Sequence, residues 1–216
     1  MVIPGFSLAA ESYSLSKIGY PQGLSNSAVL SVFRDNKGFM WFGTYDGLNR
    51  YDGKKMDVYR ADPNRENKLL NNVIYKVNSA EQGNLWISTS TGINLISLRK
   101  EAVMDSYEIF NDEYALYSNR KGTTWMINDG NLFYYDYTKG KFNLISHLEH
   151  FFNRKLPFVD DKDNLWLFSS ENNQVYRCHL DTIQVKELTA NMTPVVFHQK
   201  RIEYTSYQNG ILGFVD

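Results

Sequence analysis

The chain has 216 residues, which is enough for one all-β domain or two small domains with a buried core. Hydrophobic residues make up 43% of it, which excludes a disordered chain, and aromatic residues reach 15%, a share that suits β-strands. The net charge of −1 leaves no basic excess to neutralise phosphates, so no nucleic-acid partner is expected. The single cysteine, Cys178, allows neither an intrachain disulfide nor a cysteine-based zinc site.

The N-terminal residues 1–11 are mostly apolar, with two small residues, Ala9 and Ala10, before Glu11. They lack the basic start of a secretory signal and are too short to span a membrane. Two interpretations stay open for this segment: the remnant of a signal peptide that begins upstream, or a flexible terminus. No other apolar run approaches membrane length, so we expect no direct membrane insertion of this segment.

A tryptophan-centred sequence recurs along the rest of the chain. The copies are FMWFGTYDGLNRYD (39–52), NLWISTSTGINLIS (84–97), TTWMINDGNLFYYD (123–136), NLWLFSSENNQVYRCH (164–179) and, more weakly, IEYTSYQNGILGFVD (202–216). The same place in each copy is held by Trp41, Trp86, Trp125, Trp166 and Tyr204, in steps of 45, 39, 41 and 38 residues. A period of about 40 residues indicates one supersecondary unit stacked several times.

Each copy contains four short β-like runs separated by polar turns such as DNKG and AEQG. Four antiparallel strands in about 40 residues are typical of a β-propeller blade, so the sequence predicts an all-β propeller. About five blades are visible, the last without its outer strand: roughly 24–60, 69–110, 113–145, 154–189 and 195–216. Residues 12–18 could supply that outer strand and close the ring. A small five-bladed ring and a piece of a larger propeller both remain open, and we favour the piece.

The glycines of the first copy have backbone explanations. Gly38 and Gly47 lie where tight hairpin turns require a positive φ. Gly43 lies within a strand, where close approach of a neighbouring backbone is the usual cause. The repeat tryptophans are expected to pack between blades.

The stretch GLSNSAVLSVFRDNKGFMWFGTYDGLNRYDG (23–53) resembles the two-component regulator propeller repeat, and the later copies resemble it progressively less. The resemblance covers residues 13–216 and implies the periplasmic sensor region of a Bacteroides-type hybrid histidine kinase. Such regions are built from seven-bladed propellers and detect oligosaccharides. It implies a signal-transduction module that senses carbohydrate, works as a homodimer in the full-length receptor, and has no cofactor and no catalytic role in this segment.

Enzyme motifs are absent from the sequence: there is no HExxH, GxSxG, Walker loop or CxxC. The stretch SNRKGTTW (118–125) resembles the Asp-box of sialidase-like propellers, but Arg120 replaces the aspartate. His147 and His150 have a spacing that could chelate a metal on a helix, although a solvated linker explains them better. We therefore expect no catalytic residue and no metal site. A propeller lyase or glycosidase and a protein-interaction scaffold remain as alternatives.

Ligand binding is best placed in the turns after the second strands and in the links between blades, which emerge on one face of a propeller. These segments, which include residues 89–91, are rich in aromatic and planar polar side chains, which suit the faces and hydroxyls of sugars. Solvated loops are the alternative. Arg60, Asp62 and Arg65 are the preferred contacts, and the full set of candidates is Tyr45, Asp46, Arg60, Asp62, Asn64, Arg65, Asn128 and Asp129.

Overall fold

The structure, a computed structural model, describes residues 15–62, 68–109, 114–119, 122–148, 158–160, 162–169, 174–179, 193–195, 204–208 and 211–215. Within this part the chain forms antiparallel sheets, together with two short 3-10 turns, η1 (Tyr20–Gln22) and η2 (Glu81–Gly83). Four sheets have four strands each and a fifth has two.

The strands pair in chain order within each sheet. The first sheet holds β1 (Val29–Arg34), β2 (Met40–Thr44), β3 (Gly47–Tyr51) and β4 (Met56–Tyr59); the second holds β5 (Ile74–Ser79), β6 (Leu85–Thr89), β7 (Gly92–Ser97) and β8 (Ala102–Glu108). The third holds β9 (Tyr114–Ser118), β10 (Thr124–Asn128), β11 (Asn131–Asp136) and β12 (Lys141–His147). The fourth holds β13 (Phe158–Val159), β14 (Asn164–Ser169), β15 (Gln174–His179) and β16 (Thr193–Val195), and the fifth holds β17 (Tyr204–Gln208) and β18 (Ile211–Val215).

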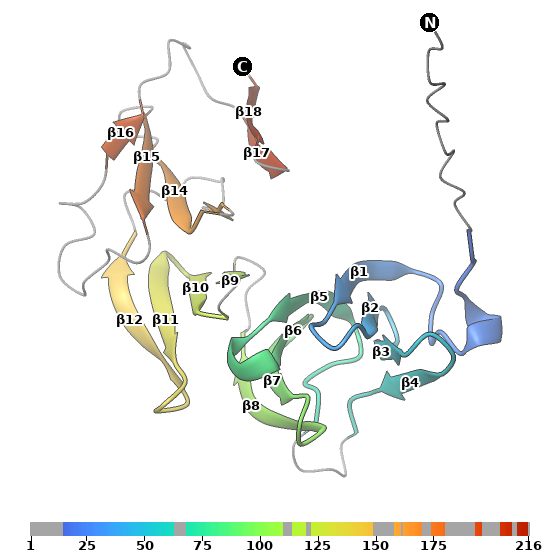
Figure 1. Cartoon of the computed structure of the whole chain (residues 1–216). Coiled ribbons are helices and arrows are strands. Elements are labelled where there is room, and N and C mark those ends of the chain that lie inside the picture. Colours follow the sequence, from blue (N-terminus) through green and yellow to red (C-terminus); the bar gives the residue numbers. More distant parts are fainter. Residues whose placement is uncertain are drawn as a thin grey trace, which may run out of the picture.

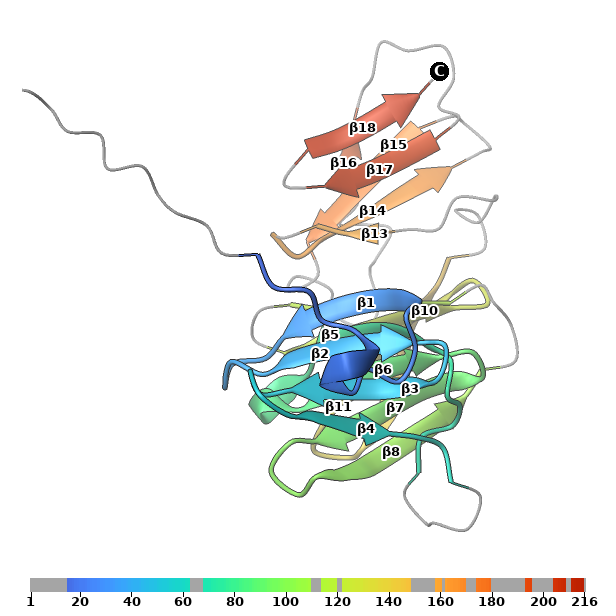
Figure 2. The same ribbon diagram turned by 90° about the vertical axis from the view of Figure 1, so that its right-hand side faces the viewer.

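The sheets follow one another around an arc, with the first strand of each of the first three sheets on the inner side (Figure 1). Strand β1 contacts β5, β5 contacts β9, and β9 contacts β13. Figure 2 shows the first sheet lying face to face with the second. Consecutive four-stranded antiparallel sheets arranged around an inner edge are propeller blades, so the predicted fold class is confirmed. The number of blades in a complete ring stays a prediction.

The core lies between the sheets rather than within any one of them. Trp41 and Leu48 of the first sheet form one buried cluster with Ile74 and Ile87 of the second. Further clusters join the second sheet to the third around Trp86, and the third to the fourth around Trp125. A sheet buries one face only against another layer, so each blade is completed by its neighbour.

The repeat tryptophans are also held by their indole N–H groups. Trp41 Nε1 donates to Asp35 Oδ2 at 2.9 Å, and Trp166 Nε1 donates to Asp160 Oδ2 at 2.8 Å. In the second sheet Ala80 stands in the place of that aspartate. Trp86 Nε1 donates instead to two groups of the third sheet, Thr124 Oγ1 at 3.0 Å and the Tyr137 hydroxyl at 3.1 Å.

Buried asparagines on the third strands fasten the loop before each first strand. Asn49 and Asn94 are fully buried. Asn49 Oδ1 accepts the backbone N–H of Ser25 at 2.9 Å, and Asn94 Oδ1 accepts that of Leu70 at 3.0 Å. The asparagine of the repeat is therefore a structural residue, because a buried amide must have its hydrogen bonds satisfied.

The glycines of the first blade are set by turns and by the neighbouring backbone. Gly38 has a φ of +92° and Gly47 a φ of +119°, both in the left-handed region that favours glycine. A Cβ at Gly43 would lie 2.9 Å from the carbonyl oxygen of Ile74 in the second sheet. Gly43 therefore permits the close approach of two blades.

The segment expected to close the ring forms no strand over its described part, residues 15–18. The side chain of Leu15 is 98% exposed, so it packs against no sheet. This stretch therefore lacks the packing that would hold it as a strand. The remaining residues of that segment, 12–14, and the N-terminal residues 1–11 lie outside the described residues.

We predict that Gly43→Ala destabilises the chain by about 1–3 kcal/mol, because the added methyl group meets backbone and forces the first two blades apart. Urea unfolding followed by tryptophan fluorescence measures the effect. Gly19→Ala is the matched control, since the atom nearest to its Cβ lies 3.8 Å away and its φ of −161° suits alanine. Equal stability of the two variants would contradict the close approach.

We predict that Asp35→Ala costs about 1–3 kcal/mol of stability, because the buried Trp41 N–H loses its acceptor. The same carboxylate also accepts the backbone N–H groups of Lys37 at 2.9 Å and Phe39 at 3.0 Å. Lys37→Ala, an exposed change in the same turn, is expected to stay within about 0.5 kcal/mol of the parent. The same urea titration compares the two, and a loss no larger than that of the control would refute the role of Asp35.

Candidate functional site

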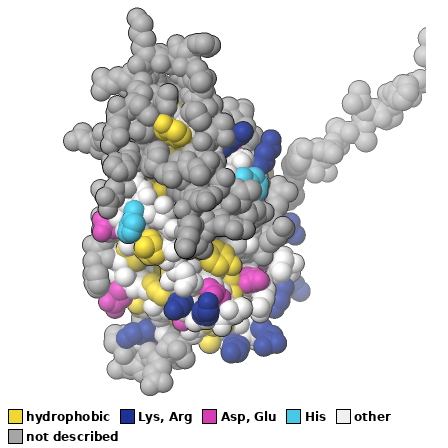
Figure 3. All heavy atoms as spheres, turned by 90° about the vertical axis from the view of Figure 1, so that its left-hand side faces the viewer, with side chains coloured by type: hydrophobic (Ala, Val, Ile, Leu, Met, Phe, Trp, Pro, Cys, Tyr) yellow, Lys and Arg dark blue, Asp and Glu magenta, His cyan; other side chains and the backbone are white. Residues whose placement is uncertain are grey.

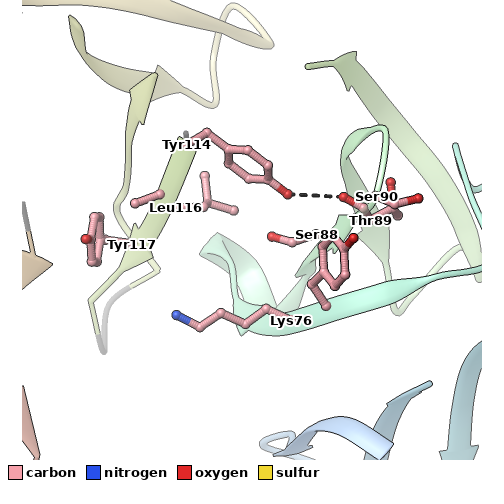
Figure 4. A pocket seen from close by; sticks show the side chains of 9 residues that line it. Lys76, Ser88, Thr89, Ser90, Tyr114, Leu116 and Tyr117 are labelled. Atoms are coloured by element: carbon pink, nitrogen blue, oxygen red, sulfur yellow. Dashed lines mark hydrogen bonds between the residues drawn. The ribbon is translucent and has the colours of Figure 1, made fainter. Parts of the chain in front are cut away.

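A cavity of about 410 Å³ lies between the second and third sheets (Figure 4). Strand β5, the end of β6 with its turn, and strand β9 form its walls, through Tyr75, Lys76, Ser88, Thr89, Ser90, Tyr114, Ala115, Leu116 and Tyr117. Thr89 and Tyr114 lie at strand ends next to the β6–β7 and β10–β11 turns, so the cavity reaches the face on which these turns emerge. Its volume is within the range of small-molecule sites, about 300–1,000 Å³.

A β-bulge shapes one wall of the cavity. The pairing of β5 with β6 shifts between Ile74 and Lys76, which leaves Tyr75 as the extra residue. In a regular strand two consecutive side chains point to opposite faces, and a bulge removes this restriction. Tyr75, 48% exposed, and Lys76, also exposed, therefore both line the cavity.

The opposite wall is aromatic and is joined to the first wall by a hydrogen bond. The hydroxyl of Tyr114 in β9 donates to the carbonyl oxygen of Thr89 in β6 at 3.3 Å (Figure 4). Burial raises the pKa of Tyr117 well above its ordinary value, so its phenol keeps its proton at neutral pH. The Thr89 hydroxyl is committed to its own turn, donating to the Gly92 carbonyl at 2.9 Å. The cavity thus combines tyrosine rings with hydroxyl and backbone polar groups.

Lys76 is the charged residue among those that line the cavity. Its side chain extends from β5 toward β9, on the side where Tyr117 lies (Figure 4). Burial by the surrounding protein lowers the pKa of its amino group, although much of the side chain is still reached by solvent. The described lining holds no aspartate, glutamate or histidine, so it offers binding groups but no carboxylate pair for acid–base chemistry.

The structure brings together two of the ligand contacts expected from the sequence. Asp46, in the β2–β3 turn beside Tyr45, accepts from Arg60 Nη2 at 2.9 Å and from Arg60 Nε at 3.2 Å. The hydrogen bond from Arg60 lowers the pKa of Asp46, and the same bond raises the pKa of Arg60. Both side chains are nearly half exposed, so they form a surface ion pair in which each charged group has the other as its partner.

The other expected contacts lie elsewhere. Asp62 lines a pocket of about 170 Å³ between β4 and β8, and Arg60 lines it as well. Asn128 ends β10, and Asp129 occupies the following turn with a φ of +47°. Asn64 and Arg65 lie outside the described residues. None of the individually named candidates in the described part of the chain lines the cavity, whereas Thr89 and Ser90 of the expected segment 89–91 do. The role of all these residues in binding stays a prediction.

Sequence reasoning missed four lining residues: Tyr75, Lys76, Tyr114 and Tyr117. They belong to first strands, whereas the sequence argument looked only at turns and links. One signal was present. Lys76 places a long charged side chain in a first strand at the position where the first copy has Ser31. The bulge that turns Tyr75 inward has no signature in the sequence.

Two other pockets formed by described residues are smaller, with volumes of about 170 and 10 Å³. On the face shown in Figure 3, basic, acidic and hydrophobic side chains are interspersed without one large patch of a single kind. His147 Nδ1 lies 2.6 Å from Asn131 Oδ1. The described residues contain no group of three or more histidine, cysteine or acidic residues placed to hold a metal ion. In the same part of the chain no helix is long and apolar enough to cross a membrane.

Comparison with known sequences identifies relatives of the first repeat. Residues 23–46 match the model of the two component regulator propeller family. Over 41 residues the chain is 46% identical to Histidine kinase P4 of Formosa agariphila, a match that covers 19% of this chain and 3% of the kinase.

Solved structures with the same fold include extracellular domains of two-component systems and a lyase. The extracellular domain of a hybrid two-component system from B. thetaiotaomicron has a TM-score of 0.62 at 20% identity, over 92% of this chain and 29% of that chain. A second such domain from the same organism has a TM-score of 0.59 at 21% identity, over 94% and 30%. Virginiamycin B lyase from Staphylococcus aureus has a TM-score of 0.53 at 15% identity, over 89% and 64%.

These findings define the class of protein: a β-propeller with up-and-down four-stranded blades. The chain carries the two-component regulator propeller repeat in its first blade, which confirms the resemblance found in the sequence. It spans less than a third of the two Bacteroides domains and a small fraction of the kinase.

We predict a weak coupling between Asp46 and Arg60. A double-mutant cycle of Asp46→Ala and Arg60→Ala, measured by urea unfolding, should give about 0.2–1 kcal/mol, because the pair is solvent-exposed. The coupling should shrink in about 1 M salt, where charges are screened within a few ångströms. A coupling above about 2 kcal/mol would show that the pair is a structural element of the blade instead.

Proposed function

We propose that the chain is a ligand-sensing, oligosaccharide-binding propeller region of a bacterial two-component signalling receptor, and that it performs no chemistry itself. The observation that carries this proposal is the cavity between the second and third sheets. It has the size of a small-molecule site, and tyrosines line both of its walls.

The chemistry of the lining favours a sugar. The faces of tyrosine rings suit the C–H surfaces of a pyranose, and phenolic and serine hydroxyls suit its hydroxyl groups. Tyr75 offers an exposed ring, and Tyr114 is fixed in place by its bond to Thr89. A rigid aromatic surface loses little conformational entropy when it binds a ligand.

The likeness to extracellular domains of hybrid two-component systems supports a role in sensing and an extracytoplasmic, periplasmic location. The cavity is built from two blades, so a bound ligand contacts both and favours one relative position of them. A ligand shifts a conformational equilibrium only through such differential contacts. In a homodimeric receptor this preference passes to the arrangement of the two copies.

A protein-interaction scaffold is the second candidate. The inner strand of the first sheet exposes apolar side chains, with Val29 38%, Leu30 37% and Val32 58% exposed. A propeller lyase is supported only by the shared fold of the Staphylococcus enzyme, because the described cavity lining lacks carboxylates and histidines.

We predict saturable binding of an oligosaccharide to the purified chain, measured by titration calorimetry over a panel of plant and bacterial glycans. Tyr75→Ala should weaken the affinity by about tenfold or more, because it removes the exposed ring of the cavity. Tyr20→Ala removes a tyrosine that is 62% exposed outside the cavity and should leave affinity unchanged.

Three outcomes would contradict this proposal. Absence of measurable binding by the folded chain to any glycan of the panel would contradict the sensing role. If the chain then captured a defined protein partner, the scaffold would be favoured. Binding that Tyr75→Ala leaves intact would place the site elsewhere, with Tyr45 the next residue to test. Turnover of a bound glycan would replace the sensor by an enzyme.

A further inference from the structure

Comparison of the repeats shows whether the blade fold requires a lysine at the position of Lys76. Each of the first three inner strands places one residue opposite the second residue after the repeat tryptophan. These residues are Ser31 opposite Gly43, Lys76 opposite Ser88, and Ala115 opposite Ile127. Serine and alanine are accepted at this position by the same strand pairing, so the blade does not require a long, charged side chain there.

The amino group of Lys76 also lacks a partner within the described part of the chain. No hydrogen bond or ion pair joins it to another described residue, and the residues that line the cavity with it include no acid. The protein around this amino group lowers its pKa by desolvation, although the side chain as a whole is exposed to solvent. A charged group that is partly withdrawn from water and unpaired gains most from an anion that arrives with a ligand.

We propose that this cavity takes an acidic sugar, with the ammonium group of Lys76 binding an anionic group of the sugar beside the tyrosine rings. This inference rests on the proposed function and specifies its ligand. The tyrosines would hold the sugar ring, and Lys76 would select for the charge. The anion is a carboxylate in a uronic acid or a sulfate ester in a sulfated sugar, and both present oxygens that accept from an ammonium group.

The test compares matched acidic and neutral ligands on the purified 216-residue chain by titration calorimetry. The probes are trimers of galacturonate, glucuronate and mannuronate, the carboxyl-reduced form of each, and a sulfated galactose trisaccharide with its desulfated form. At least one acidic probe should bind about tenfold or more tightly than its neutral partner, because a hydrogen bond to a charged group is among the strong ones. This advantage should shrink as salt is added.

Three variants separate the role of Lys76 from general charge. Lys76→Met should remove the advantage of the acidic probe while keeping the affinity for its neutral partner. Lys76→Arg should retain most of it, and it keeps the test decisive if the methionine variant fails to fold. Lys54→Met changes an exposed lysine in the β3–β4 turn, outside the cavity, and should behave as the parent chain.

Every outcome bears on the inference. Preference for the uronate trimers or for the sulfated probe supports it and identifies the anion. Equal binding of acidic and neutral probes, or an acidic preference that survives in Lys76→Met, overturns it but leaves the sensing proposal standing. Absence of binding by all of these probes, acidic and neutral, overturns the inference, while the broader glycan panel decides separately whether the sensing proposal stands.

Discussion

The contact between one blade and the next is the constraint on which the rest of this structure depends. Trp41 is completely covered only because Ile74 and Ile87 of the second sheet lie against it. At the same interface the chain has no side chain at Gly43, so the carbonyl of Ile74 approaches its Cα closely. A single twisted sheet of four short strands cannot bury its own face, so stability in such a chain is shared between neighbours.

Polar groups strengthen this contact where the repeat has diverged. Loss of the turn aspartate at Ala80 leaves Trp86 without an acceptor in its own blade, and Tyr137 and Thr124 of the next blade supply one. Arg50 adds a second link: it stacks over Phe39 at 5.1 Å and pairs with Glu101 of the second sheet at 3.0 Å. The Trp86 N–H therefore bonds across the interface between the second and third blades, whereas Arg50 links the first and second blades.

The same geometry creates the site. The inner strands of the second and third blades leave room for a cavity between them, and the bulge at Tyr75 lets two adjacent side chains line it. Most of the residues that line the cavity lie on strands, which favours precise placement of a ligand. The cavity also lies at the interface that holds the blades together, so occupancy and blade position are physically linked.

The sequence by itself determined the blade repeat, the class of fold and the structural part of the repeat. The period of Trp41, Trp86, Trp125 and Trp166 and the alternation of strands and turns depend on local chemistry, which one copy of the repeat already contains. Residues such as Gly47 have a purely local reason, the left-handed backbone of a turn. Such features can be inferred from neighbours in sequence.

Only the tertiary structure decided where the site lies. Tyr75 and Tyr114 are separated by 39 residues in sequence and meet because two sheets pack side by side, and the bulge that turns Tyr75 inward depends on how β5 pairs with β6. Asp46 and Arg60, which looked available for a ligand, are joined in an ion pair across their own blade. Packing between two sheets sets the first of these features, and the pairing and turns of strands within one blade set the other two.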